Sequence, residues 1–220
     1  MFYKPMVKTF IITPGIFLGV LFSQTFSEST PVHTYSIVAF DEETGELGVA
    51  VQSHWFSVGF LVPWAKAGVG AVATQSFVKV DYGPEGLNRM EHGQSAEEAL
   101  NSLLAEDEGE AVRQVAMIDV KGSVAAHTGT KCIYAAGHQI GKNYSVQANL
   151  MEKETVWPSM ANAFERSNGD LAEKMMAALE AAEAEGGDIR GKQSAAMLIV
   201  SGNPTGIPWK DVVMNIRVDD

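Results

Sequence analysis

The sequence predicts a mixed α+β fold in which two antiparallel sheets are stacked face to face, each covered outside by a pair of helices. Three observations predict this four-layer αββα sandwich. The 220 residues are 46% hydrophobic and 20% charged, an ordinary composition for one globular domain. Strand and helix patterns come in blocks, in the order strands, two helices, strands, two helices, strands. Strands and helices do not alternate singly, so a doubly wound parallel sheet is not expected.

The first block predicts a β-hairpin followed by a third strand. Residues 34–40 (TYSIVAF) are rich in strand-forming residues, residues 41–45 (DEETG) suit a turn, and residues 46–53 (ELGVAVQS) suit the returning strand. Residues 68–76 (GVGAVATQS) predict another strand, whose small side chains permit close approach of a second layer. Residues 55–64 between them are expected to form an apolar loop that lies in the core or at an oligomer contact.

The next block changes to a helical period. Ser95 and Glu98 have the spacing of a capping box, and the helix that follows has one apolar stripe, formed by Ala96, Ala99, Leu100, Leu103 and Leu104. A shorter helix over residues 87–91 is expected to precede it and to end at Gly93.

The second half of the chain repeats this arrangement. Strands are expected over residues 114–119, 123–128, 135–140 and 144–150, followed by helices over residues 157–166 and 171–185. The second of these helices is capped by Asp170 and stopped by Gly186 and Gly187. Its predicted buried stripe consists of Met175, Met176, Leu179 and Ala182. Strands over residues 195–201 and 212–218 complete the fold, the last of them half-exposed.

The N-terminus has the pattern of a secretory signal. Lys4 and Lys8 precede an apolar run over residues 10–22, and small polar residues follow. We therefore expect residues 1–29 to be a removed signal peptide, residues 30–33 a short leader and residues 34–220 the folded domain, exported to the periplasm or the exterior. Cleavage is expected after Ser27 or Ser29, and no membrane association afterwards. The alternative is a membrane anchor, for which the run is short.

Composition excludes some functions. The net charge is -11 and no basic patch is present, so nucleic acid is not an expected partner. The five histidines lack metal-ligand spacing, and we expect neither a metal nor an organic cofactor. Cys132 is the only cysteine and is interpreted as a buried thiol, since a nucleophilic cysteine needs a histidine partner and an activating environment.

Thr34 is the residue whose type and position suggest a catalytic role. A threonine hydroxyl is a weak nucleophile that needs a neighbouring base. If the peptide bond before Thr34 is cut, the freed α-amine, with a pKa near about 8, can be that base. Thr34 opens the first strand just after the exported leader. From the residues alone, a threonine at a strand start is better explained by β-propensity than by catalysis.

Several segments resemble the DUF1028 family. They are residues 33–39 (HTYSIVA), 44–53 (TGELGVAVQS), 62–75 (VPWAKAGVGAVATQ), 82–87 (YGPEGL) and 186–195 (GGDIRGKQSA). The resemblance covers residues 33–220, and it implies the N-terminal-nucleophile (Ntn) hydrolase-like fold, a four-layer sandwich. Similar chains place the threonine right after the initiator methionine, whereas here Thr34 needs self-cleavage or another protease. Similar chains also continue past residue 220, so the C-terminus is expected to be truncated.

The resemblance also implies site residues. Thr34 is the implied nucleophile, with Ser36, on the same strand face, as the fallback. Lys66 is the implied cation near the nucleophile, Asn149 the implied oxyanion donor, and Asp188 the carboxylate beside the amine. The alternative for Lys66 is a solvated loop lysine, and for Asp188 an Asx turn paired with Arg190.

Three further side chains complete the implied site. Gln52 and Ser53 are expected to hydrogen-bond the new terminus, and Gln75 to act as a second amide donor to the oxyanion.

The sequence therefore predicts an exported Ntn-type hydrolase that cleaves an amide or peptide-like bond in a small molecule or peptide, and that forms a homo-oligomer. The alternative is a catalytically inactive Ntn-like domain that binds a small molecule or serves in assembly, because a fold can be retained after its catalytic activity is lost. The substrate is not defined by the sequence.

Overall fold

A computed structural model describes residues 31–32 and 34–220, with side chains from residue 34 on. The predicted signal peptide (1–29) lies outside the described residues, as do residues 30 and 33 of the predicted leader. In the described part of the chain, none of the helices is both long and apolar enough to cross a membrane.

The larger sheet has six antiparallel strands in the order β11-β10-β3-β2-β9-β8. Their bounds are β2 (Thr34–Phe40), β3 (Glu46–Ser53), β8 (Gly137–Gly141), β9 (Tyr144–Asn149), β10 (Ser194–Ser201) and β11 (Val212–Val218). The β2–β3 hairpin has the predicted bounds. Its turn is closed by the Asp41 carboxylate, which accepts from the backbone nitrogen atoms of Glu43 and Thr44, and Gly45 takes the positive φ of 76° that the turn requires.

The smaller sheet is also antiparallel, in the order β1-β5-β6-β7 with β4 on the same side of β5 as β1. Its strands are β1 (Pro31–Val32), β4 (Pro63–Lys66), β5 (Gly70–Phe77), β6 (Arg113–Asp119) and β7 (Val124–Thr128). The expected loop over residues 55–64 instead contains a 3₁₀ turn (Val58–Phe60) and the start of β4. A four-residue strand shows no clear alternation in sequence, and its pairing with β5 is what forms it.

Five α-helices are present in the described residues: α1 (Tyr82–Glu91), α2 (Ala96–Ala105), α3 (Val156–Arg166), α4 (Leu171–Ala184) and the short α5 (Pro208–Asp211). The predicted capping box at Ser95 and Glu98 is confirmed, as is the cap at Asp170. Helix α1 begins five residues before the predicted start at residue 87. Pro84 is tolerated in the first turn, and Gly83 allows the Trp64 ring to lie against the helix.

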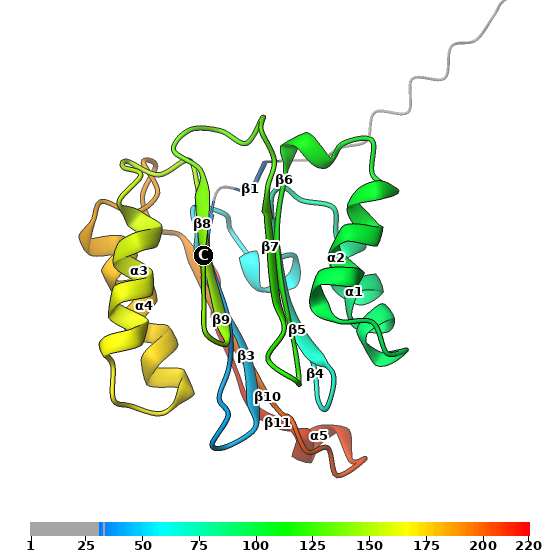
Figure 1. Cartoon of the computed structure of the whole chain (residues 1–220). Helices are drawn as coiled ribbons and strands as arrows, with labels where there is room; N and C mark the ends of the chain where they lie inside the picture. The colour runs from blue at the N-terminus through cyan, green and yellow to red at the C-terminus, as the bar shows by residue number, and fades with distance from the viewer. Residues whose placement is uncertain (1–30, 33) are drawn as a thin grey trace, which may run out of the picture.

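The helices form outer layers on the two sheets (Figure 1). Helices α3 and α4 cover the outer face of the six-stranded sheet, and α1 and α2 cover the outer face of the other. The predicted order of strands, helix pair, strands, helix pair and strands is therefore observed. The molecule is a mixed α+β fold built on two antiparallel sheets.

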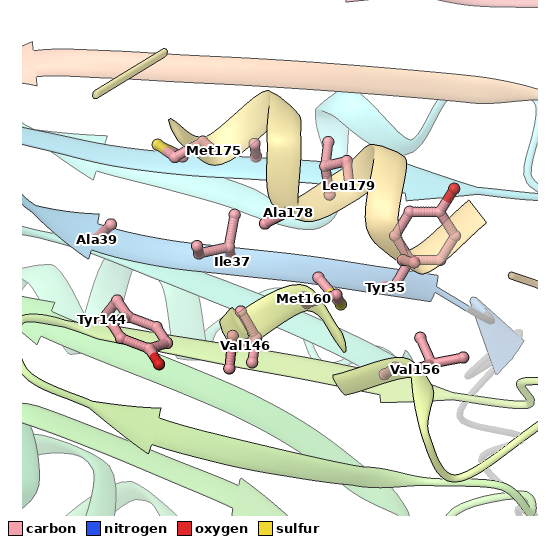
Figure 2. Close-up of a cluster of buried hydrophobic side chains, with 14 of the residues drawn as sticks. Tyr35, Ile37, Ala39, Tyr144, Val146, Val156, Met160, Met175, Ala178 and Leu179 are labelled. Atoms are coloured by element: carbon pink, nitrogen blue, oxygen red, sulfur yellow. The ribbon is translucent and has the colours of Figure 1, made fainter. Parts of the chain in front are cut away.

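The side chains of β2 alternate between two cores. Tyr35, Ile37 and Ala39 face α3 and α4, where they pack with Met160, Met175 and Leu179 (Figure 2). The prediction that Met176 belongs to this stripe was wrong, because its side chain is 43% exposed. Met176 lies about 100° around the helix from Met175, which places it at the side of the stripe.

The second core lies between the sheets. Val38, Leu47, Val49 and Val51 meet Ala71, Ala73, Ala116 and Ile118 there. The small residues of β5 allow the close approach that the sequence predicts. Toward the start of β2 this inter-sheet layer changes from apolar to polar, and the candidate site lies at that change.

Candidate functional site

Thr34 is the first residue of β2 and points into the layer between the sheets. It lies opposite Ser53 on β3 and opposite Asn149 on β9. Its side chain is fully buried, and its hydroxyl donates to Oγ of Ser53 at 3.2 Å. Sequence prediction placed Thr34, Ser53 and Asn149 at one site, and the structure brings these three together.

Three side-chain amides from three strands meet beside Thr34; we call Gln75, Gln114 and Asn149 the amide cluster. Oε1 of Gln114 accepts from Nε2 of Gln75 at 2.7 Å and from Nδ2 of Asn149 at 2.9 Å. The same two nitrogen atoms lie 3.3 Å and 3.5 Å from the carbonyl oxygen of Thr34, which accepts from both. Gln75 and Gln114 belong to one sheet and Asn149 to the other, so the cluster joins the two sheets at this point.

Ser36 extends the polar layer along β2. Its hydroxyl donates to Oε1 of Gln75 at 2.6 Å and accepts from Nε2 of Gln147 at 2.6 Å. Ser145 in turn donates to Oε1 of Gln147 at 3.0 Å. Ser36 faces the same layer as Thr34, as predicted, and its hydroxyl is fully engaged in positioning the two glutamines.

Gln114 is the residue of the cluster that sequence analysis missed. Its Nε2 has three acceptors that share its two protons: Oγ1 of Thr128 at 2.9 Å and the carbonyl oxygen atoms of Ala148 at 2.9 Å and Gly137 at 3.1 Å. The available signal was alternation: Gln114 shares a strand face with Ala116 and Ile118, so an amide is placed where an apolar side chain is expected.

A histidine ends this chain of hydrogen bonds. Thr128 Oγ1 lies 2.8 Å from Nδ1 of His138. Since the hydroxyl already accepts from Gln114, its own proton is available to the imidazole. Burial, and secondarily the neighbouring His127, lower the pKa of His138 below its usual value of 6.5, which favours the neutral ring.

Asp188 lies next to the end of β3, where its carboxylate is buried. Oδ1 accepts from the backbone nitrogen of Arg190 at 2.9 Å, which is an Asx turn, and Oδ2 pairs with the Arg190 guanidinium at 2.6 Å. Oδ2 also lies 3.4 Å from the backbone nitrogen of His54. The Asx turn and the arginine pair, which the sequence offered as the alternative for Asp188, are both present.

Two predicted residues do not join the cluster. Lys66 ends β4 opposite Gly70 and pairs with Glu91 at 2.6 Å, while Gln75 lies five residues further along β5, about 17 Å away. The expectation that Lys66 lies beside Thr34 is therefore not met. Gln52 faces the opposite side of the sheet from Ser53, because successive residues of a strand alternate, so it does not reach the terminus of β2 either.

Within residues 34–220, neither a metal-binding cluster nor a reactive thiol provides a further candidate site. Residues 34–220 hold no group of three or more His, Cys, Asp or Glu side chains placed to bind a metal ion. Cys132 is partly buried and its Sγ donates to the carbonyl oxygen of Arg113 at 3.3 Å. Burial raises the pKa of this thiol, which disfavours the reactive thiolate.

The site thus consists of a buried threonine at the start of a strand, a serine beside its hydroxyl and amide donors from both sheets. Such an arrangement can fix a hydroxyl and supply N–H donors to an oxygen, which are two requirements of acyl-transfer chemistry. The fold and this cluster define a class: mixed α+β proteins with a polar site at the strand start where two antiparallel sheets meet.

Comparison with known proteins gives the family. The chain matches DUF1028, a family of unknown function, over residues 34–220, and it belongs to that family. It is similar to the crystal structure of protein SPO2555 from Silicibacter pomeroyi, of family DUF1028, with a TM-score of 0.75 and 29% sequence identity over 85% of this chain and 81% of that one. A search of curated proteins returns no match.

Proposed function

We propose that this protein is an exported hydrolase of the Ntn type, with an Ntn-hydrolase-like sandwich fold, that uses Thr34 to cleave an amide or peptide-like bond. The observation that carries the proposal is the placement of Thr34. Its hydroxyl lies within hydrogen-bonding distance of Ser53, and amide donors from both sheets bond its backbone carbonyl oxygen. The start of a buried strand is also where a freed α-amine is held next to its own hydroxyl.

The path of the chain before Thr34 supports a processing step. Pro31–Val32 pairs with β5 of one sheet, whereas Thr34 begins β2 of the other, so the chain changes sheets between residues 32 and 34. Cleavage of the bond before Thr34 leaves β2 anchored on both sides by β3 and β9. The new amine is then fixed without help from the leader.

The proposed reaction has two stages. The α-amine of Thr34 takes the hydroxyl proton while Oγ1 attacks the substrate carbonyl carbon, and the leaving amine is protonated as the C–N bond breaks. Water then hydrolyses the resulting ester and returns Thr34 to its starting form. Asn149 is the proposed oxyanion donor, a contribution worth roughly 3 kcal/mol in hydrolases, with Gln75 as the second donor. Asp188 holds the amine end, and Lys66 takes no part.

A second candidate is a small-molecule binding protein without catalysis. The observation that favours it is that the donor nitrogen of the proposed oxyanion residue is already used, since Nδ2 of Asn149 bonds Gln114 and the Thr34 carbonyl oxygen. Under this alternative the cluster is a structural element that joins the sheets.

Processing separates the two candidates. Intact-mass measurement and N-terminal sequencing of the exported protein are expected to show a chain that begins at Thr34. Thr34→Ala is expected to leave the preceding bond intact, Thr34→Ser to preserve cleavage, and the exposed control Thr130→Ala to behave as wild type. Melting temperatures establish that each variant is folded.

Activity is then assayed on a panel of small amides, γ-glutamyl compounds and peptides. A functional protein that retains its leader, and that is unaffected by Thr34→Ala, refutes the hydrolase and supports the binding protein.

A further inference from the structure

A cavity lies on the other side of the six-stranded sheet from Thr34. It has a volume of about 330 Å³ and lies between α4 and the β10–β11 edge of the sheet. Its walls are mostly apolar and include Leu179 of α4, Met197 of β10 and Ile216 and Val218 of β11. Tyr35 and Leu179, which border it, point to the same side of the sheet (Figure 2).

The cavity exists because the outer helices do not extend to the end of the sheet. Helix α4 packs on β2 and β3, whereas β11 is the edge strand beyond β10, and most of its residues are exposed. The side chains of Ile216 and Val218 are consequently 52% and 67% exposed. Apolar surface at an edge strand is unfavourable in water, and a ligand that covers it gains from that burial.

One polar side chain inside this cavity lacks a hydrogen bond. Gln52 is only 6% exposed, yet neither Oε1 nor Nε2 bonds any group in the described part of the chain. The neighbouring polar groups bond one another instead of Gln52: the Tyr35 hydroxyl donates to Glu183 at 2.9 Å, and Lys192 pairs with Glu183 at 3.1 Å. Burying a carboxamide without hydrogen-bond partners destabilises the folded protein. A ligand in this cavity that supplies one acceptor and one donor to Gln52 removes that penalty.

We propose that this cavity binds a small neutral molecule with an apolar body and a carboxamide or lactam group. Oε1 of Gln52 accepts from the ligand N–H and Nε2 donates to the ligand carbonyl oxygen, a pairing that only a group with adjacent donor and acceptor completes. The apolar walls take the body of the ligand. This site is independent of the proposed hydrolase chemistry, because it lies on the opposite face of the sheet and uses none of the amide cluster.

The charges around the cavity favour a neutral ligand. Glu183 and Lys192 neutralise each other at its border, and Arg217 pairs with Asp219 at 2.9 Å. Glu180 also lines the cavity, but its side chain is exposed to solvent. An anionic group next to Gln52 therefore has no free cation to pair with, and a cationic group buried there would lose its hydration for a solvated carboxylate, so a neutral ligand is favoured.

Hexanamide and δ-valerolactam are the probes for this site, with methyl hexanoate as the matched compound that lacks the N–H donor. Protein-observed NMR titration of the full-length protein measures Kd. The amides are expected to bind saturably, with shifts in residues around Gln52, and methyl hexanoate to bind at least tenfold more weakly.

Two variants and one control test the geometry. Gln52→Leu removes the amide and keeps the volume, and is expected to weaken hexanamide at least tenfold while the melting temperature stays level or rises. Ala195→Leu fills the cavity from the strand position opposite Gln52 and is expected to abolish binding. The exposed Gln94→Leu is expected to change neither quantity.

Equal affinity of wild type and Gln52→Leu for hexanamide, or the absence of saturable binding of both amides to the wild type, overturns the proposal. Because Thr34 is untouched in all three variants, the outcome is separate from that of the processing experiment.

Discussion

Replacing Gln114 by leucine tests whether the amide cluster holds the two sheets together. Gln114 is fully buried, and its amide lies within hydrogen-bonding distance of five groups, two at Oε1 and three at Nε2. Because Nε2 carries two protons that its three acceptors share, the amide makes about four full hydrogen bonds. Leucine fills similar space but makes none of these bonds. The amides of Gln75 and Asn149 keep the Thr34 carbonyl oxygen as an acceptor, so they are not left entirely unpaired.

The magnitude follows from these bonds. A net value of about 1 kcal/mol for each of about four bonds gives a loss of about 4 kcal/mol, and the retained contacts to Thr34 reduce it to about 3–4 kcal/mol. For a domain of this size each kcal/mol lowers the melting temperature by about 2–4 °C, so a decrease of roughly 10 °C is expected. Gln114→Glu keeps the acceptor but places a carboxylate opposite the carbonyl oxygen atoms of Gly137 and Ala148. It is expected to be destabilised at pH 7 and to recover stability as the pH falls, because burial raises the pKa of an acid and the folded state then binds the proton.

Urea unfolding followed by circular dichroism measures these differences, with the exposed Gln94→Leu as the matched control. The control is expected within about 0.5 kcal/mol of wild type. A Gln114→Leu protein whose unfolding free energy lies within about 1 kcal/mol of wild type refutes the reasoning, since the cluster then contributes little to holding the sheets together.

Two further predictions concern titratable groups. Asp107→Asn removes a buried carboxylate that accepts from Nε of Arg113 at 2.9 Å and from the Tyr82 hydroxyl at 3.1 Å, and a loss of about 3 kcal/mol is expected in urea unfolding at pH 7. Burial alone raises the pKa of Asp107, but the bonds from Arg113 and Gly109 outweigh burial and hold the pKa below 3.8. This carboxylate therefore stabilises the fold above pH 3.8. As the pH falls below that value, the variant is expected to lose less stability than wild type. The lowered pKa of His138 means that the unfolded chain binds a proton at a higher pH than the folded chain, so wild-type stability falls as the pH drops below about 6.5. His138→Gln is expected to flatten the plot of melting temperature against pH between pH 7 and pH 5. An unchanged slope contradicts the assignment.

Much of the fold was predictable because its elements have local causes. The β2–β3 hairpin follows from two runs of strand-forming residues and a turn closed by Asp41, and the starts of α2 and α4 follow from capping residues next to them in sequence. Elements that depend on pairing were missed. Strand β4 and helix α5 have four residues each, which is too short for the hydrophobic periodicity of a strand or a helix to be recognised in the sequence.

The candidate site was predictable only in part. Ser36, which lies two residues from Thr34, necessarily shares its strand face, and the structure confirms this placement. Gln114 was also within reach, since it interrupts an inward-facing apolar pattern. The roles assigned to Thr34, Asn149 and Asp188, the signal peptide and the exported location stay predictions. The processing experiment tests the role of Thr34 and the position of cleavage.

The sequence by itself determined where most strands and helices lie, because strand-forming runs, turn residues and capping residues act over short distances along the chain. It also determined that Gln52 and Ser53 face opposite sides of their strand. Only the tertiary structure decided which ends of the strands meet, since register between distant segments depends on how whole layers pack. That register placed Gln75, Gln114 and Asn149 beside Thr34, left Lys66 at the far end of β5, and buried Gln52 in a cavity of its own.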